Sequence, residues 1–258
     1  MSGAHPQLEV QNLSLAFGGF TVLKGIDAAF KAGEITGLIG PNGAGKTSLF
    51  NCLTGLYRPQ SGAIHFAGTQ FDGLPPAIRA KHGLARSFQH VALCPDLTAV
   101  ENVMFGLSRK GESGWAGALL GLPKTRQEEA ATRQQAYQAL DKLGIARTAN
   151  LLPTELPPGT LRLVEIARAI VSKPRILLLD EPAAGLNAAE TRELTSVLRQ
   201  LVAPDLVMVV VEHDMDLIMG VCDSIYVLNF GSLVAHGTPA AVRSSPEVAR
   251  IYLGTDDD

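Results

Sequence analysis

The residues best suited to chemistry lie in one glycine-rich loop, Gly40–Thr47, which reads GPNGAGKT. An apolar run over residues 35–39 precedes the loop, and a helical pattern follows it. Glycines allow backbone N–H groups to turn towards phosphate oxygens, and the start of the following helix adds partial positive charge. The strand, loop and helix come in the order that phosphate binding requires, which makes an accidental glycine-rich turn the weaker interpretation.

We therefore predict that this loop binds the phosphates of a nucleotide. From an exposed loop, Lys46 is expected to reach the β- and γ-phosphates, and the Thr47 hydroxyl is expected to bind Mg²⁺. The predicted nucleotide-binding residues of the loop are Gly40, Pro41, Asn42, Gly43, Ala44, Gly45, Lys46, Thr47 and Ser48.

Two adjacent carboxylates end a second apolar run, residues 176–179. Asp180 is expected to hold Mg²⁺ through its water shell, and Glu181 is expected to activate the attacking water. By itself, an apolar run that ends in Asp-Glu usually marks a strand that reaches solvent. The phosphate-binding loop in the same chain favours the catalytic interpretation.

Apolar runs and helical periodicity predict the elements that must position these groups. Strands are expected over residues 8–17, 21–23, 26–30, 35–39, 63–66, 85–88, 176–179 and 206–211, with a final hairpin over 224–229 and 232–236. Helices are expected over about 46–56, 126–143 and 161–172, and again between the strands at 176–179 and 206–211. Strand–helix–strand alternation implies an α/β core with a parallel sheet, here interrupted by a helical lobe from about 90 to 172.

Composition excludes several classes of partner and site. The chain has 22 basic and 25 acidic residues and a formal net charge of −3, so it lacks the concentrated positive charge that nucleic-acid binding needs. Its three cysteines, Cys52, Cys94 and Cys222, lie far apart, which argues against a cysteine-ligated metal site or a disulfide framework. The N-terminus does not resemble a signal peptide, and the longest apolar run, Leu206–Val211, is too short to cross a bilayer. Work at a membrane would therefore require other proteins.

The order of these segments resembles that of an ATP-binding subunit of an ABC transporter. The phosphate loop is followed by Gln89 after a short strand, by the Asp180-Glu181 pair, and by His213 after an apolar strand. The resemblance extends from Leu8 to Gly254. It implies a P-loop NTPase core with a mainly parallel sheet, an N-terminal antiparallel β-subdomain and an inserted helical subdomain.

The resemblance also implies roles for single residues. Gln89 matches the glutamine that contacts Mg²⁺ and the attacking water, His213 matches the histidine at the γ-phosphate, and Phe17 matches the aromatic residue that stacks on adenine. The implied catalytic set is Glu181, His213, Gln89 and Lys46, and the implied Mg²⁺ set is Thr47, Gln89 and Asp180. The alternatives are a surface glutamine, a capped loop histidine and a core phenylalanine.

Two segments depart from the family pattern. The signature segment, usually Leu-Ser-Gly-Gly-Gln, falls on Leu156-Pro157-Pro158-Gly159-Thr160, so the serine hydroxyl and one glycine are missing. Asn187 stands where the family usually has aspartate. Both segments belong to the contact between two ATP-binding subunits. Symmetric hydrolysis by such a pair is therefore in doubt.

Three segments, residues 85–90, 180–187 and 237–254, are most similar to ATPases of branched-chain amino-acid importers. Such importers imply a second, different ATP-binding subunit, two transmembrane permease subunits and an extracytoplasmic substrate-binding protein. They place this chain on the cytoplasmic face of the cell membrane. Importers of amides or urea and ATPases of lipopolysaccharide export remain alternatives, as do a soluble ABC ATPase outside transport and an ATP-sensing regulatory subunit.

The expected organisation along the chain is simple. Residues 1–7 are expected to form a flexible N-terminus, residues 8–254 a single ATP-binding domain, and residues 255–258 an acidic tail.

Overall fold

The structure is a computed structural model that describes residues 7–87, 92–107 and 123–253 of the chain. Its internal contacts separate two compact units, residues 1–86 with 175–258, and residues 87–174. The chain thus leaves the first unit after Arg86 and returns to it at Arg175. The predicted flexible N-terminus and acidic tail lie outside the described residues, except for Gln7, which begins a strand.

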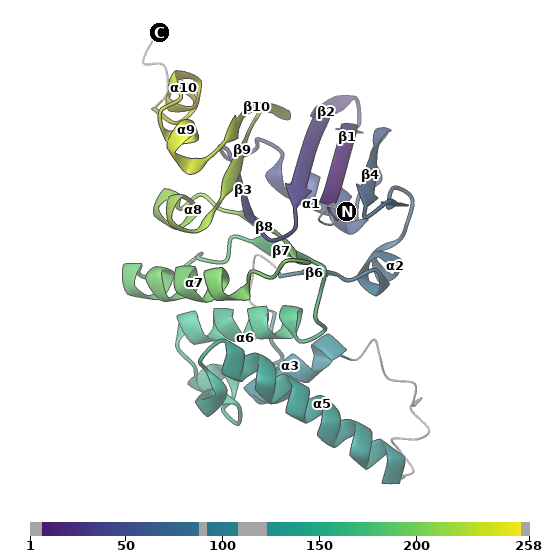
Figure 1. Ribbon diagram of the computed structural model, residues 1–258, viewed down its shortest axis with the longest axis vertical. Helices are drawn as coiled ribbons and strands as arrows, with labels where there is room; N and C mark the ends of the chain where they lie inside the picture. Colours follow the sequence, from purple (N-terminus) through teal and green to yellow (C-terminus); the bar gives the residue numbers. More distant parts are fainter. Residues whose placement is uncertain (1–6, 88–91, 108–122, 254–258) are drawn as a thin grey trace. The chain divides into compact units, whose positions relative to one another are not determined.

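A six-stranded sheet forms the centre of the first unit (Figure 1). Its spatial order is β10 (Ser232–Gly237), β9 (Ser224–Asn229), β3 (Ile35–Ile39), β8 (Val207–Val211), β7 (Ile176–Asp180) and β6 (Leu84–Arg86). All neighbouring pairs are parallel except β9 with β10. Every residue of β3, β7 and β8 is buried, as expected for the centre of a parallel sheet. The predicted fold class is confirmed.

A second sheet is antiparallel and holds the N-terminal strands. Its order is β2 (Phe20–Lys31), β1 (Gln7–Phe17), β4 (Ser61–Phe66) and β5 (Thr69–Gln70). The prediction of two strands over 21–23 and 26–30 was wrong. One strand continues through Gly25, whose φ of 58° suits glycine, and shifts in the β1–β2 register absorb the irregularity.

Helix α1 (Lys46–Thr54) joins the two sheets through one hydrophobic cluster, to which Phe30, Leu38 and Phe50 belong. The helix ends two residues before its predicted end, because Gly55 adopts a left-handed cap with φ 82°. The opposite face of β3 meets α8 (Met215–Val221), since a Cβ on Gly37 would lie 3.2 Å from Ile218 Cδ1. Helix α7 (Ala188–Leu201) packs beside α8, so helices cover the parallel sheet on both faces. Helix α2 (Pro76–Lys81) precedes β6.

The second unit is helical. Helices α3 (Ala99–Met104), α5 (Pro123–Lys142) and α6 (Pro158–Ile170) pack against one another, with short turns η1 (Phe105–Leu107), η2 (Ala146–Thr148) and η3 (Pro153–Glu155) between them. Helix α6 begins three residues before its predicted start at Leu161. Proline is tolerated at the first helical position, because the N–H that it lacks would have no partner there.

The chain finishes with α9 (Pro239–Arg243) and α10 (Pro246–Leu253) beside β10 (Figure 1). Strand β6 ends at Arg86, and Phe88 from its predicted range lies outside the described residues. Within the described ranges, no helix has the length and apolar character needed to span a membrane.

Candidate active site

The glycine-rich loop connects the carboxyl end of β3 to the first turn of α1. Gly40, Gly43 and Gly45 have φ values of 153°, 79° and 107°. A Cβ on Gly40 would overlap the Leu228 carbonyl oxygen, and one on Gly45 would lie 2.9 Å from Leu23 Cδ2. Helix α1 has no side-chain cap at Gly45. The backbone N–H groups at the start of a helix can bind an anion.

The Lys46 side chain is buried, although its loop was expected to be exposed. The ammonium donates to the carbonyl oxygens of Gly40 at 2.6 Å and Pro41 at 3.0 Å. Burial lowers the pKa of Lys46, while the nearby charges of Glu181 and Asp180 act in the opposite direction. The two carbonyl contacts tie the Lys46 side chain to its own loop.

The two carboxylates at the end of β7 differ in environment. The Asp180 side chain is only 2% exposed, and its Oδ2 accepts a bond of 2.6 Å from Arg86 Nη2. Glu181 has a φ of 46°, in the left-handed region that non-glycine residues rarely adopt, and its N–H donates to the Val211 carbonyl at 2.9 Å. Asp180 contacts Arg86, whereas Glu181 Oε2 lies 4.0 Å from His213 Nδ1, so the adjacent carboxylates have different neighbours.

His213 follows β8 and faces Glu181. Its Nδ1 lies 4.0 Å from Glu181 Oε2 and 3.7 Å from Glu212 Oε2, and its side chain is 65% exposed. The structure therefore brings His213 and Glu181 together at the same edge of the sheet.

Sequence reasoning did not single out Glu212, although its side chain connects two loops of the site. Its fully buried carboxylate accepts bonds from the backbone N–H groups of Ala183 at 2.7 Å, His213 at 3.0 Å and Asp214 at 3.3 Å. Burial raises the pKa of Glu212, and these N–H groups partly oppose the rise. Glu212 thus links the loop after Glu181 to the loop of His213. The available signal was an acidic residue directly after a fully buried strand.

Phe17 ends β1 as a half-exposed ring, not as a core residue. Tyr57, which was not predicted, meets it edge to face with ring centroids 5.2 Å apart. Gln60 bonds both the N–H and the carbonyl of Ala16 at 2.7 Å, which fixes the backbone just before Phe17. The pair presents an aromatic surface of the kind that a planar ring can contact.

The remaining predicted residues are less completely placed. Gln89 lies outside the described residues. In the second unit, Pro157 is the N-cap of α6 and forms no side-chain cap, while Pro158, Gly159 and Thr160 belong to the helix. Asn187 is the N-cap of α7, and its side-chain oxygen accepts from Ala189 N–H at 2.9 Å and Glu190 N–H at 3.1 Å. It therefore has a clear structural role.

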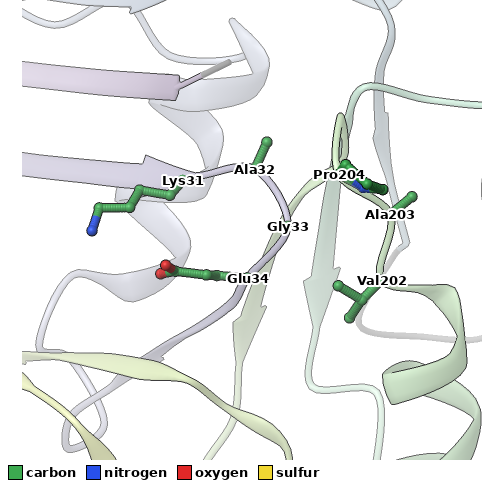
Figure 2. A pocket seen from close by; sticks show the side chains of 7 residues that line it. All are labelled: Lys31, Ala32, Gly33, Glu34, Val202, Ala203 and Pro204. Atoms are coloured by element: carbon green, nitrogen blue, oxygen red, sulfur yellow. The ribbon is translucent and has the colours of Figure 1, made fainter. Parts of the chain in front are cut away.

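One hollow of the first unit lies away from the predicted site. A hollow of about 470 Å³ is lined by the Lys31–Glu34 turn and by Val202–Pro204 (Figure 2). These segments precede β3 and β8, so the hollow lies at the amino ends of the parallel strands. The phosphate loop and the carboxylates follow the carboxyl ends, where open α/β sheets bind their ligands.

A glycine-rich loop between β3 and α1, with paired carboxylates at the end of β7, defines the class of P-loop ATPases. Residues 23–184 match the family described as ABC transporter, and residues 232–258 match the one described as branched-chain amino acid ATP-binding cassette transporter. The chain belongs to the ABC transporter family and is the ATP-binding ATPase subunit of a transporter complex.

The relatives extend over the full chain. The high-affinity branched-chain amino acid transport ATP-binding protein LivG of Escherichia coli is 40% identical and covers 97% of this chain and 99% of its own length. BraF of Pseudomonas aeruginosa, which has the same description, is 39% identical with the same coverage. The ADP conformation of an ATP-binding cassette from an ABC transporter has a TM-score of 0.84 at 29% identity, covering 96% of this chain and 99% of its own.

Proposed function

We propose that this chain binds MgATP at residues 40–48 and hydrolyses it with Glu181 to power the import of branched-chain amino acids. The observation that carries the chemical part is that the loop of Lys46 and the Asp180-Glu181 pair follow the carboxyl ends of β3 and β7, two parallel strands of one sheet. The substrate class is supported by the match of residues 232–258 and by the names of LivG and BraF.

In this proposal the loop holds the phosphates. Backbone N–H groups at the start of α1 and the Lys46 ammonium bind the β- and γ-phosphate oxygens, so Lys46 exchanges carbonyl partners for phosphate. Phe17, with Tyr57 beside it, stacks on the adenine. The His213 ring approaches the γ-phosphate from the edge of the sheet that also carries Glu181.

The oxygen donors present fit a magnesium ion. Thr47 provides a hydroxyl at the start of α1, and Asp180 provides a buried carboxylate at the end of β7. Mg²⁺ prefers such oxygen ligands and keeps several waters and phosphate oxygens around them. With Gln89 as a third ligand, these residues would hold the ion, which supplies charge neutralisation for the transferred phosphoryl group.

Glu181 then accepts a proton from the attacking water. The Glu181 N–H donates to the Val211 carbonyl at the end of β8, and the Ala183 N–H in the following loop donates to the Glu212 carboxylate. These two hydrogen bonds limit the movement of the backbone that carries the Glu181 carboxylate. His213, whose own N–H is bound to Glu212, is limited by the same residue.

The proposed assembly contains a second, different ATP-binding subunit, two transmembrane permease subunits and an extracytoplasmic binding protein that delivers the solute. The chain would lie on the cytoplasmic face of the cell membrane. Its family supports this location, because an ATP-binding subunit transmits work to membrane subunits.

The test is to reconstitute the complete transporter in proteoliposomes and to measure ATP hydrolysis and uptake with the binding protein loaded with leucine, isoleucine or valine. Stimulation of both is expected, and Lys46→Ala in the same complex should abolish them. Stimulation by amides or urea alone would show that these compounds, and not branched-chain amino acids, are the substrates. Lipid release without amino-acid uptake would replace import with export.

A further inference from the structure

Arg86 connects three elements of the candidate site. It ends β6, and its guanidinium donates through Nη2 to Asp180 Oδ2 at 2.6 Å and through Nη1 to Asn51 Oδ1 at 2.7 Å. The same guanidinium lies 5.6 Å from the centre of the Phe50 ring. Asn51 and Phe50 belong to α1, the helix that begins with Lys46. Arg86 therefore joins the predicted metal carboxylate to the helix of the phosphate loop.

The pair is almost fully withdrawn from water. The side chains of Arg86 and Asp180 are 11% and 2% exposed. A carboxylate this deep is costly unless an opposite charge lies beside it. In the structure Arg86 provides that charge at hydrogen-bond distance.

Arg86 is incompletely bonded in this position. Its Nε is buried, and within the described part of the chain it has no hydrogen-bond partner. A buried donor without a partner is unfavourable, so the guanidinium occupies this position at some cost in free energy. The contact with Asp180 is kept despite that loss, which indicates that neutralising the carboxylate dominates.

We propose that Arg86 is a positioning residue that serves as the resident counter-ion of Asp180 in the nucleotide-free protein and yields part of that role to the cation that accompanies ATP. The inference rests on the proposed function, since it takes Asp180 as the magnesium carboxylate. The guanidinium and the cation compete for one negative charge and repel each other, so removal of Arg86 should weaken the nucleotide-free fold and strengthen cation binding.

The experiment compares Arg86→Gln and Arg86→Lys with wild type in the isolated chain. The melting temperature is measured without ligand, with a non-hydrolysable ATP analogue in EDTA, and with the same analogue during a Mg²⁺ titration. Lysine keeps the charge but cannot bond Asp180 and Asn51 in the planar fork of arginine. If Arg86→Gln does not fold, Arg86→Lys decides the outcome.

We expect Arg86→Gln to lower the ligand-free melting temperature and to lower the midpoint of the Mg²⁺ titration by about tenfold, equivalent to about 1.4 kcal/mol. Arg86→Lys should fall between Arg86→Gln and wild type. A merely structural residue would lower the melting temperature and leave the Mg²⁺ midpoint unchanged.

Arg79→Lys provides the matched control. Arg79 is also buried and also bonds α1, but its guanidinium contacts the carbonyl oxygens of Cys52, Leu53 and Leu74 and, among the described residues, no carboxylate. This variant should lose stability without a change in the Mg²⁺ midpoint.

Asp180→Asn separates failure of the inference from failure of the proposed function. If Asp180→Asn leaves the Mg²⁺ midpoint at the wild-type value, Asp180 is not the metal carboxylate and the proposed site is wrong. If Asp180→Asn raises the midpoint while both Arg86 variants leave it unchanged or raise it, the site stands and the counter-ion role of Arg86 is overturned.

Discussion

At the scale of single residues, the candidate site depends on charged side chains buried against the backbone. Lys46 is held by two carbonyl oxygens of its own loop, and Glu212 is held by three N–H groups. Both sets of contacts lie within the protein. Both fix the segments from which the predicted catalytic groups extend, so substitutions at these positions should affect folding stability as well as chemistry.

Lys46→Ala illustrates this double effect. The variant should lose tight MgATP binding, because the charge that meets the phosphates is removed. It should also lose roughly 1–3 kcal/mol of unfolding free energy, because the Gly40 and Pro41 carbonyl oxygens lose their partner. Nucleotide titration and chemical denaturation of the purified chain measure the two effects. Unchanged nucleotide affinity in the folded variant would contradict the assignment of residues 40–48 as the phosphate-binding loop.

At the scale of elements, the two segments that depart from the family pattern both lie at helix N-termini. Asn187 caps α7 with its side chain, and Glu190 completes a capping box by accepting the Asn187 N–H at 2.9 Å. Pro157 cannot provide a comparable side-chain cap for α6. One departure from the family pattern therefore keeps a side-chain cap at its helix, while at the other the N-cap residue forms no side-chain cap.

Asn187→Ala should destabilise the chain by about 1 kcal/mol, within the range of 0.5–2 for lost N-caps. Asn187→Asp is the matched control. Aspartate accepts the same two N–H groups, and its charge is favourable at a helix N-terminus, so stability should be retained. Denaturant unfolding of the three proteins provides the measurement. Equal stability of Asn187→Ala and wild type would show that the cap contributes nothing.

At the scale of the whole molecule, the altered signature predicts unequal ATP sites. In the family that the sequence resembles, this segment completes the site of the partner subunit. Pro157 and Pro158 lack N–H groups, and Pro157 also lacks the usual hydroxyl. Gly159, Thr160 and the start of α6 remain to attract an anion. We expect the site built from Lys46, Asp180 and Glu181 to hydrolyse ATP, while the partner's site mainly retains it.

The assembled transporter tests this asymmetry. Glu181→Gln and the equivalent substitution in the second ATP-binding subunit are made separately, and ATP hydrolysis is measured. Glu181→Gln should cause the larger loss, because the partner's site already lacks a donor, a deficit worth on the order of 10²-fold in rate. Equal losses, or normal turnover by this chain as a homodimer, would contradict the proposal.

The sequence alone determined the family, the fold class and the local plan of the phosphate loop. These features depend on contiguous residues: glycines where the backbone must turn, apolar runs where strands are buried, and carboxylates where a strand ends. Their physical requirements are met within a few positions, so spacing in the chain is enough to reveal them. The family and fold class are confirmed, and the roles of the individual site residues stay predictions.

The tertiary structure decided which groups meet across the chain. Arg86 pairs with Asp180 across 94 positions, and Glu212 reaches Ala183 across 29. The burial of Lys46 likewise came only from the structure. The partner and the exposure of a side chain depend on the order of the strands in the sheet and on the elements that pack on its faces. Those arrangements set the local charge and solvation, and through them which carboxylate has a cation beside it.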